Sequence, residues 1–244
     1  MSGKPNRLIC FGDSFSDNGF HKGHGFGRAS NGPVWGEYLC QMKGWLPPEV
    51  RAWCGAQSGF GNASMTENWS GLKWQLKQFE PPDDIANVMI SVWIGINDLY
   101  ELQNPHTLIL DNVLDVLKKL AASGAKHLLV LNIPDISMAP AYQQAPYRAL
   151  RKKVSKTIES YNQMLEKAIL GDDGLINAYK NSRWSFIDAA QMFNKLSSHY
   201  RIVDRPWLDT YAFPKQDEYM WWDNWHPMSS VHERIAKEIL NTVF

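Results

Sequence analysis

Short apolar segments separated by longer stretches with helical spacing constrain the fold of this 244-residue chain more than any other feature of its sequence. The segment from Val88 to Ile94 is apolar at almost every position, as expected of a strand buried on both faces of a sheet. Similar segments lie at 8–11 and 127–131, and shorter ones at 51–54 and 184–187. Strands that alternate with helices predict an α/β fold, in which helices cover both faces of a parallel sheet.

Apolar residues three or four positions apart predict helices between these strands. Pro33 suits the first turn of one helix, and Asn104 is a candidate N-cap for another. Near the C-terminus, Ser230 and Glu233 have the spacing of a capping box. The expected helices cover about 33–42, 69–79, 105–123, 148–170 and 231–243.

The size and charge of the chain exclude several classes of function. A length of 244 residues suits one α/β domain, and two separate cores would each be small, so we expect residues 1–244 to form a single domain. Lysine plus arginine equals aspartate plus glutamate, at 25 each, and no stretch carries a long run of one sign. This balance gives no support to nucleic-acid binding or to docking of a basic patch on a membrane.

The N-terminus and the cysteines bear on the cellular compartment. Residues 1–7 are polar and lead directly into the first apolar segment, which leaves no room for a signal peptide. No window approaches the roughly 18 consecutive apolar residues that a transmembrane helix needs. Cys10, Cys40 and Cys54 cannot all pair and indicate no disulfide framework. We expect a soluble cytoplasmic protein, although the mature form of an exported precursor would have the same features.

A polar turn with glycines at 12 and 19 follows the first apolar segment. In an open parallel sheet, ligands bind beyond the carboxyl ends of the strands, and this turn lies at such an end. We therefore predict Ser14 as a nucleophile, with Asp13 as a hydrogen-bonding brace for the turn. Ser14 is not part of a Gly-x-Ser-x-Gly sequence, so the nucleophile elbow of an α/β-hydrolase is not indicated.

A serine nucleophile requires a base, a group that orients the base, and donors for the developing oxyanion. Asp223 lies three residues before His226, so one short loop can present both side chains. Asn97 offers a side-chain amide after the segment 88–94, and Gly55 follows the segment 51–54. These residues supply each of the required groups.

The chain resembles the GDSL or SGNH family of esterases and lipases, because four blocks occur in the family's order. The blocks are Gly12-Asp13-Ser14, Gly55, Gly95-Ile96-Asn97-Asp98 and Asp223-Asn224-Trp225-His226. Residues 30–39, 132–135 and 226–227 extend the similarity over nearly the whole chain, and resemble the branch with secreted phospholipases, thermolabile haemolysins and carbohydrate acetylesterases. The resemblance implies a three-layer α/β/α sandwich with five parallel strands in the flavodoxin-like order.

The resemblance also implies a role for each candidate residue. Ser14 is expected to be the nucleophile, His226 its base, and Asp223 the group that orients His226. Gly55 and Asn97 are expected to donate to the oxyanion beside the backbone N–H of Ser14. A Ser-His-Asp mechanism assigns the same roles and requires neither a cofactor nor a metal.

Two of these assignments have competitors within the chain. Related sequences often carry two glycines where this chain has Cys54-Gly55, so Gly59 and Gly61 are alternatives to Gly55. Asp188 follows the segment 184–187 and is a second candidate for the acid that orients the base.

We predict hydrolysis of carboxylic esters through an acyl-enzyme, with short to medium acyl chains favoured. Phospholipase or acyltransferase activity on lipid esters is the alternative within this chemistry. A binding module for carbohydrate or lipid is a second alternative, because tryptophans are abundant before His226. They stand at positions 207, 221, 222 and 225, where they could line a substrate pocket or pack the histidine loop.

A metal-dependent phosphoesterase is the remaining alternative, and an enzyme of that class should be sensitive to chelators. His21 and His24 also have the look of a metal site, but they lack a third ligand and are better interpreted as part of a loop. His127 and His232 are expected to have structural roles. The potential ligands of the phosphoesterase are Asp13, Asp17, Asn97, Asp98 and His226.

Overall fold

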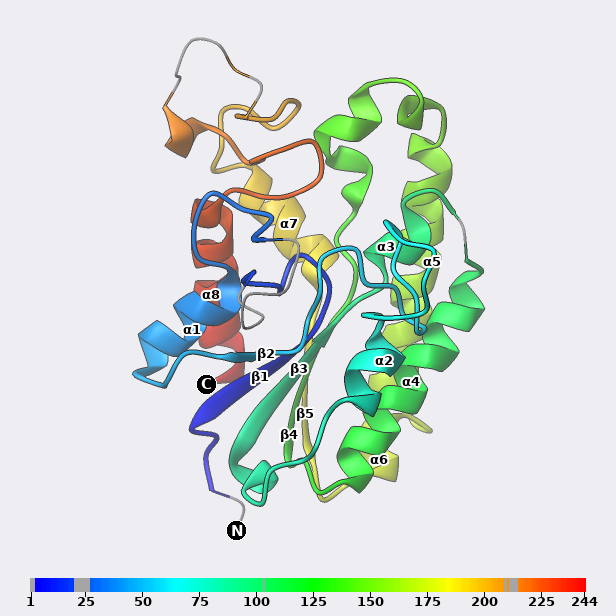
Figure 1. The fold of residues 1–244 in the computed structure, drawn as a ribbon, viewed down its shortest axis with the longest axis vertical. Helices are drawn as coiled ribbons and strands as arrows, with labels where there is room; N and C mark the ends of the chain where they lie inside the picture. Colours follow the sequence, from blue (N-terminus) through cyan, green and yellow to red (C-terminus); the bar gives the residue numbers. More distant parts are fainter. Residues whose placement is uncertain (1–2, 20–26, 103, 209, 211–214) are drawn as a thin grey trace.

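The computed structural model of the protein describes residues 3–19, 27–102, 104–208, 210 and 215–244. Five parallel strands form one sheet in the order β2-β1-β3-β4-β5 (Figure 1). This is the flavodoxin-like order, in which the direction of winding reverses between β1 and β3. The expected topology is therefore confirmed. The strands are β1 (Arg7–Gly12), β2 (Glu49–Val50), β3 (Val88–Trp93), β4 (His127–Leu131) and β5 (Arg183–Ile187).

Helices cover both faces of the sheet and make the predicted three-layer sandwich (Figure 1). One layer contains α1 (Trp35–Lys43), α7 (Ala189–Ser197) and α8 (Ser229–Val243). The other contains α2 (Leu72–Lys77), α3 (Ile96–Leu99), α4 (His106–Ala122) and α5 (Arg151–Leu170), which is followed by α6 (Leu175–Ala178). Short 3-10 helices are η1 (Ile85–Asn87), η2 (Ile136–Met138), η3 (Pro140–Gln143), η4 (Tyr147–Ala149) and η5 (Gln216–Glu218). Among the described residues, no helix is both long and apolar enough to cross a bilayer.

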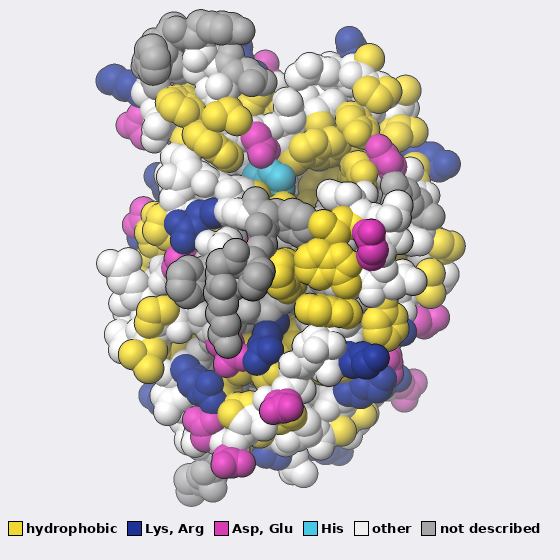
Figure 2. All heavy atoms as spheres, viewed as in Figure 1, with side chains coloured by type: hydrophobic (Ala, Val, Ile, Leu, Met, Phe, Trp, Pro, Cys, Tyr) yellow, Lys and Arg dark blue, Asp and Glu magenta, His cyan; other side chains and the backbone are white. Residues whose placement is uncertain are grey.

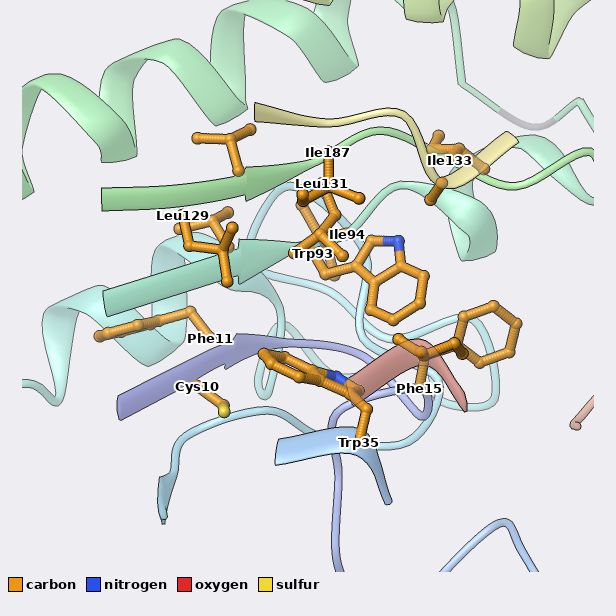
Figure 3. Close-up of a cluster of buried hydrophobic side chains, with 14 of the residues drawn as sticks. Cys10, Phe11, Phe15, Trp35, Trp93, Ile94, Leu129, Leu131, Ile133 and Ile187 are labelled. Carbon is orange, nitrogen blue, oxygen red and sulfur yellow. The ribbon is translucent and has the colours of Figure 1, made fainter. Parts of the chain in front are cut away.

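Aromatic side chains pack in the core beside the carboxyl ends of β1 and β3 (Figure 3). All six residues of β3 are buried, as its apolar sequence predicts. Phe15 packs edge-to-face on Trp93 and stacks on Phe193, with ring centroids 5.3 Å and 5.8 Å apart. Figure 3 shows Phe15, Trp35 and Trp93 converging beside the ends of these strands. The residue after Ser14 thus anchors the polar turn in the hydrophobic core.

Two elements differ from their predictions. The expected strand 51–54 is wrong, because β2 covers Glu49–Val50 and ends before residue 51. The N–H groups of Arg51 and Ala52 both donate to the carbonyl of Cys10, so the chain leaves the regular ladder there. The helix expected from residue 69 begins only at residue 72, since Ser70 has a φ of +66° and interrupts a helical path.

Both predicted N-caps are also wrong. Asn104 precedes Pro105, which is the N-cap of α4, and its side chain donates to Asp98 instead. Ser230 lies inside α8, whose first N–H, that of Ser229, donates to the side chain of Asn31. A distant side chain thus replaces the local cap. Helices α3 and α7 follow β3 and β5 directly and were not expected from apolar spacing.

Candidate active site

The polar turn after β1 is folded tightly around Asp13. The backbone N–H groups of Ser16 and Asp17 both donate to the carbonyl of Asp13 at 2.9 Å. The Asp13 carboxylate accepts the N–H of Phe15 at 3.1 Å, which gives it the bracing role expected from the sequence. Gly12 is required at the entrance, because its φ is +152° and a Cβ there would collide with the carbonyl of Trp93.

The side chains of this turn connect it to neighbouring elements. Asp17 accepts the N–H of Gly19 and the N–H of Cys54, each at 2.7 Å. Ser16 accepts the indole N–H of Trp35 on α1 at 3.1 Å. Asp17 thus ties the turn to the loop after β2, where the candidate oxyanion donor Gly55 lies.

The structure brings Ser14, His226 and Asp223 together. The hydroxyl of Ser14 lies 3.0 Å from Nε2 of His226, and Nδ1 of His226 lies 2.8 Å from the carboxylate of Asp223. Asp188 makes no such contact: it caps α7 by accepting the N–H of Gln191, and it accepts the side-chain N–H of Asn132. Of the two candidate acids, only Asp223 is hydrogen-bonded to the histidine.

The surroundings of Asp223 favour its ionised form. Burial opposes ionisation, but hydrogen bonding to His226 and the charge of that histidine outweigh it and hold the pKa of Asp223 below its usual range. The backbone N–H groups of Trp225 and His226 add two hydrogen bonds of 2.7 Å to the same carboxylate oxygen. Asp223 is therefore a carboxylate at neutral pH, with a lone pair directed at Nδ1 of His226.

The loop that carries these two residues is closed mainly by its own backbone. The N–H of Trp222 donates to the carbonyl of His226 at 2.8 Å, and Trp221 pairs with Pro227 in an antiparallel bridge. The carbonyl of Asn224 accepts the N–H of Ala141 at 3.1 Å, which fastens the tip of the loop to η3.

Ser14, Gly55 and Asn97 each bring an N–H donor to the same cavity. Within the described part of the chain, the backbone N–H groups of Ser14 and Gly55 donate to no protein acceptor. Asn97, on α3, donates one of its two amide hydrogens to the carbonyl of Ala56 at 3.0 Å, and the second remains for a ligand. These three donors, at the edge of one cavity, resemble the arrangement that stabilises a tetrahedral oxyanion.

Gly55 is better placed than the two alternative glycines. It lines the same cavity as Ser14, whereas Gly59 and Gly61 do not. The carbonyl groups of Gly59 and Gly61 instead accept the N–H groups of Lys73 and Gln57. Gly55 also needs to be glycine, because its φ is +79° and an added Cβ would collide with the side chain of Asn62.

Asp98 joins the Asn97 helix to the loop after β2. It is buried and accepts the N–H and the hydroxyl of Ser58, both at 2.9 Å, and the side chain of Asn104 at 3.1 Å. Burial raises its pKa to about 6 despite these bonds. Asp98 therefore supports the position of Asn97 relative to Gly55.

Burial also raises the pKa of Asp13 to about 8, against the lowering effect of the bond from Phe15, and the carboxylates of Asp98 and Asp17 add to the rise. Among the described residues, no group of three or more His, Cys, Asp or Glu side chains is arranged to hold a metal ion. The candidate metal ligands Asp13, Asp17 and Asp98 are instead hydrogen-bonded to protein donors. His21 and His24 lie outside the described residues.

A cavity of about 230 Å³ opens beside the serine. Ser14, Gly55, Asn97 and His226 form its polar edge. Figure 2 shows a histidine in a hollow of this face, with hydrophobic side chains gathered on both sides. The apolar residues that line the cavity are Phe15, Ala63, Ile96, Tyr100, Ile136, Tyr147 and Trp225.

The tryptophans before His226 divide between packing and lining. Trp221 is fully buried and donates to the carbonyl of Val203, so it packs the loop. Trp207 and Trp222 stack on each other at 5.3 Å. Trp225 lines the cavity and meets Tyr147 edge-to-face, with ring centroids 4.9 Å apart. Both uses of tryptophan expected from the sequence therefore occur.

Cys54 also lines the cavity, but it is a weak candidate for a nucleophile. Burial and the nearby carboxylates of Asp17, Asp13 and Asp223 raise the pKa of its thiol to about 12. His232 is fully buried behind the site, and burial lowers the pKa of its ring to about 3. It packs as a neutral ring in α8, in line with its expected structural role.

Sequence reasoning missed Gln75 and Asn62, two buried side chains that bind the backbone next to Ser14 and Gly55. A glutamine on a short helix and an asparagine in a glycine-rich loop have no distinctive spacing. Only their position opposite Gly12 and Cys54 in the folded chain identifies them.

Comparison with known proteins places this geometry in a family. The chain is 26% identical over 180 residues to phosphatidylcholine-sterol acyltransferase of Aeromonas hydrophila, an alignment that covers 66% of this chain and 53% of the relative. It is 23% identical over 278 residues to thermolabile hemolysin of Vibrio parahaemolyticus, covering 97% of this chain and 63% of the relative. The chain thus spans between about half and two thirds of the length of these relatives.

The fold is shared with a GDSL-like lipase from Bacteroides thetaiotaomicron. The two structures have a TM-score of 0.53 and 13% identity, over 97% of this chain and 86% of that one. A family model described as GDSL-like lipase/acylhydrolase matches residues 8–239, which include the turn after β1 and the histidine loop. The chain therefore belongs to the GDSL-like lipase/acylhydrolase family.

Proposed function

We propose that this protein hydrolyses carboxylic esters through an acyl-enzyme formed on Ser14. The observation that carries the proposal is the series of hydrogen bonds from Asp223 through His226 to Ser14, at the edge of a cavity that Gly55 and Asn97 also line. Membership of the acylhydrolase family supports the same chemistry.

In the first step, the hydroxyl oxygen of Ser14 attacks the ester carbonyl carbon, and its proton moves to Nε2 of His226. Asp223 accepts the Nδ1–H of the histidine, which fixes the tautomer and stabilises the imidazolium that forms. The carbonyl oxygen becomes an oxyanion. It receives hydrogen bonds from the N–H groups of Ser14 and Gly55 and from the amide of Asn97.

Collapse of this intermediate breaks the bond to the alcohol, which leaves with the proton from His226. The acyl group is then held as an ester of Ser14. A water molecule next gives its proton to His226 and attacks the acyl carbon, and the second collapse releases the acid and restores the hydroxyl of Ser14. Asp223 remains ionised throughout, in agreement with its lowered pKa.

The cavity favours short to medium acyl chains. Its volume of about 230 Å³ lies below the roughly 300–1,000 Å³ of sites that enclose a drug-sized ligand. Ile96, Ile136 and Trp225 offer apolar surface to a chain of a few methylene groups.

Transfer or hydrolysis of lipid esters is the second candidate, because the relative from Aeromonas hydrophila is a phosphatidylcholine-sterol acyltransferase. Its chemistry would use the same acyl-enzyme, with an alcohol in place of water as the acceptor. The apolar side chains on both sides of the hollow are compatible with a lipid substrate (Figure 2).

Hydrolysis of p-nitrophenyl esters from acetate to palmitate would test the proposal. We expect wild-type activity to peak at short or medium chains, to survive a chelator, and to disappear in Ser14→Ala. Ser155→Ala is the matched control, since it also removes a hydrogen-bonded serine hydroxyl, but on α5. Absence of activity on every ester, or wild-type rates in Ser14→Ala, would contradict the proposal, and an optimum at palmitate would favour the lipid alternative.

A further inference from the structure

Gln75 binds the backbone of the residue that leads into the serine turn. Its side-chain oxygen accepts the N–H of Gly12 at 3.0 Å, and its side-chain nitrogen donates to the carbonyl of Gly12 at 2.7 Å. The same nitrogen donates to the carbonyl of Ser70 at 2.8 Å. Gln75 is only 1% exposed, so these bonds hold in a site that water does not reach. One amide thus connects the end of β1 with the start of α2.

Ser70 links Gln75 to the loop after β2. It is fully buried and adopts a φ of +66°, an uncommon conformation for a residue with a side chain. Its hydroxyl accepts the side-chain N–H of Asn62 at 2.8 Å. Strain of this kind persists only where the surroundings over-determine the backbone, and Gln75 and Asn62 bind Ser70 at its carbonyl and its hydroxyl.

Asn62 completes the connection at the peptide that joins Cys54 to Gly55. Its amide donates to the carbonyl of Cys54 at 2.8 Å, and its oxygen accepts the N–H of Ser64 at 2.9 Å. In a trans peptide the carbonyl and the N–H point in opposite directions. By holding the carbonyl of Cys54, Asn62 therefore fixes the orientation of the peptide that carries the N–H of Gly55, at the edge of the cavity that Gly55 lines.

We propose that Gln75, Ser70 and Asn62 act as one set of positioning residues, which fixes Ser14 relative to the oxyanion donor Gly55. The proposal rests on the function proposed above. None of the three lines the cavity, so they act on the reaction only through the backbone that they hold. An error of about 1 Å in such a placement can cost on the order of 100-fold in rate, even when it arises away from the reacting atoms.

Gln75→Met is the first test, because methionine has a similar length and volume but no amide. We expect kcat to fall by about 10-fold or more with KM nearly unchanged, since the lost alignment matters in the transition state. Asn162→Leu is the matched control. Asn162 on α5 binds the N–H and the carbonyl of Ile133 after β4 in the same way, at 3.0 Å and 2.7 Å. It should lower Tm without a comparable fall in kcat.

Equal losses of kcat in Gln75→Met and Asn162→Leu, at similar losses of Tm, would show general destabilisation and overturn the inference. Ser70→Ala is a milder variant that removes one hydroxyl, and it serves if Gln75→Met does not fold. It should lower kcat several-fold. If the variant kept the kcat of the wild type, the bond between Asn62 and Ser70 would have no role in positioning the site.

A double-mutant cycle between Gln75→Met and Asn62→Ala tests whether the residues act together. Residues of one hydrogen-bond network are expected to be non-additive, so the double variant should lose little more kcat than the worse single variant. Additive losses would overturn the shared role. If Ser14→Ala abolishes activity while Gln75→Met retains it, the inference fails and the proposed function stands. If Ser14→Ala keeps wild-type rates, the proposed function fails first.

Discussion

The serine turn, residues 12–17, and the histidine loop, residues 219–228, place their reactive groups by different means. The serine turn is buried throughout and is held by groups far away in sequence, such as Gln75 and Trp35. The histidine loop is partly exposed and is closed by its own backbone, through the bond from Trp222 to His226. The turn therefore combines local bonds to Asp13 with bonds from distant side chains, whereas the loop closes mainly through its own backbone and is fastened to η3 at its tip.

The carboxylates of the two regions differ accordingly. Asp13, in the turn, has no cationic partner among the residues that the structure describes, and burial raises its pKa to about 8. Asp223, in the loop, has His226 as its partner, which overcomes the effect of burial and lowers its pKa. Burial therefore decides the protonation of the first group, whereas at the second group hydrogen bonds from His226 and from backbone N–H groups outweigh burial. This difference separates a residue that braces the backbone from one suited to assist proton transfer.

The largest effect is expected from Asp223→Asn, which keeps the shape of the side chain but removes its negative charge. We expect kcat for ester hydrolysis to fall on the order of 1,000- to 10,000-fold, because the histidine loses the partner that holds its productive tautomer. Steady-state kinetics with a thermal melt would test this. Asp188→Asn is the control, since Asp188 caps α7 and should affect Tm more than kcat. Similar kcat losses in both variants would contradict a special role for the loop carboxylate.

Asn97→Ala should have the next largest effect. Loss of one oxyanion donor typically costs on the order of 100- to 1,000-fold in kcat. Asn104→Ala, two positions before the start of α4, removes a bond to Asp98 without removing a donor from the cavity. If Asn104→Ala reduced kcat as strongly as Asn97→Ala, the side chain of Asn97 would have only a structural role.

Asp13→Asn tests whether burial raises the pKa of Asp13, through the dependence of protein stability on pH. The pKa of Asp13 is about 8 in the folded protein and near the usual value of roughly 3.9 in the unfolded chain. The folded state therefore binds the proton more tightly, and the stability that Asp13 contributes below about pH 4 is lost as the pH rises toward 8. Asparagine can still accept the N–H of Phe15, so the variant should escape this loss.

The measurement is the Tm of both proteins between pH 4 and 8. The difference in favour of Asp13→Asn should grow with pH over this interval. Asp98, whose pKa is about 6, contributes a slope of the same sign to both proteins, so the role of Asp13 is taken from the difference between them. A difference that does not change with pH would mean that Asp13 is ionised in the folded protein without cost.

The smallest effect is expected from Asn31→Ala, which tests whether the histidine loop needs a distant side chain at the point where it enters α8. Asn31 accepts the N–H of Ser229 at 2.7 Å, where the loop enters α8. Loss of an N-cap costs about 1 kcal/mol in the free energy of unfolding, which a urea titration can resolve. Asn241→Ala, an exposed position on the same helix, is the control. No loss relative to that control would show that the loop enters α8 without help from residue 31.

Much of the fold follows from the sequence because each strand is a local feature. The apolar segment 88–94 matches β3, and 127–131 matches β4, since a strand buried on both faces is apolar along its length. The prediction for segment 51–54 is wrong, because the N–H groups of Arg51 and Ala52 both donate to the carbonyl of Cys10 instead of continuing the ladder. Hydrogen bonding between this segment and β1 depends on both partners, so it cannot be predicted from the sequence of the segment alone.

The sequence by itself determined which residues are candidates for the chemistry. Ser14, Asn97 and the Asp223–His226 pair follow apolar segments or share one loop, and such placement is visible in the order of residues. Only the tertiary structure decided that Asp223 and not Asp188 reaches the histidine.

The tertiary structure also decided which groups hold the candidates in place. Gln75 binds Gly12 across 63 positions of sequence, and no spacing rule links two such residues. The cavity has the same origin, because its walls come from Gly55, α3, η4 and the histidine loop. Sequence motifs record the groups that react, whereas packing between distant segments fixes their distances, burial and pKa values.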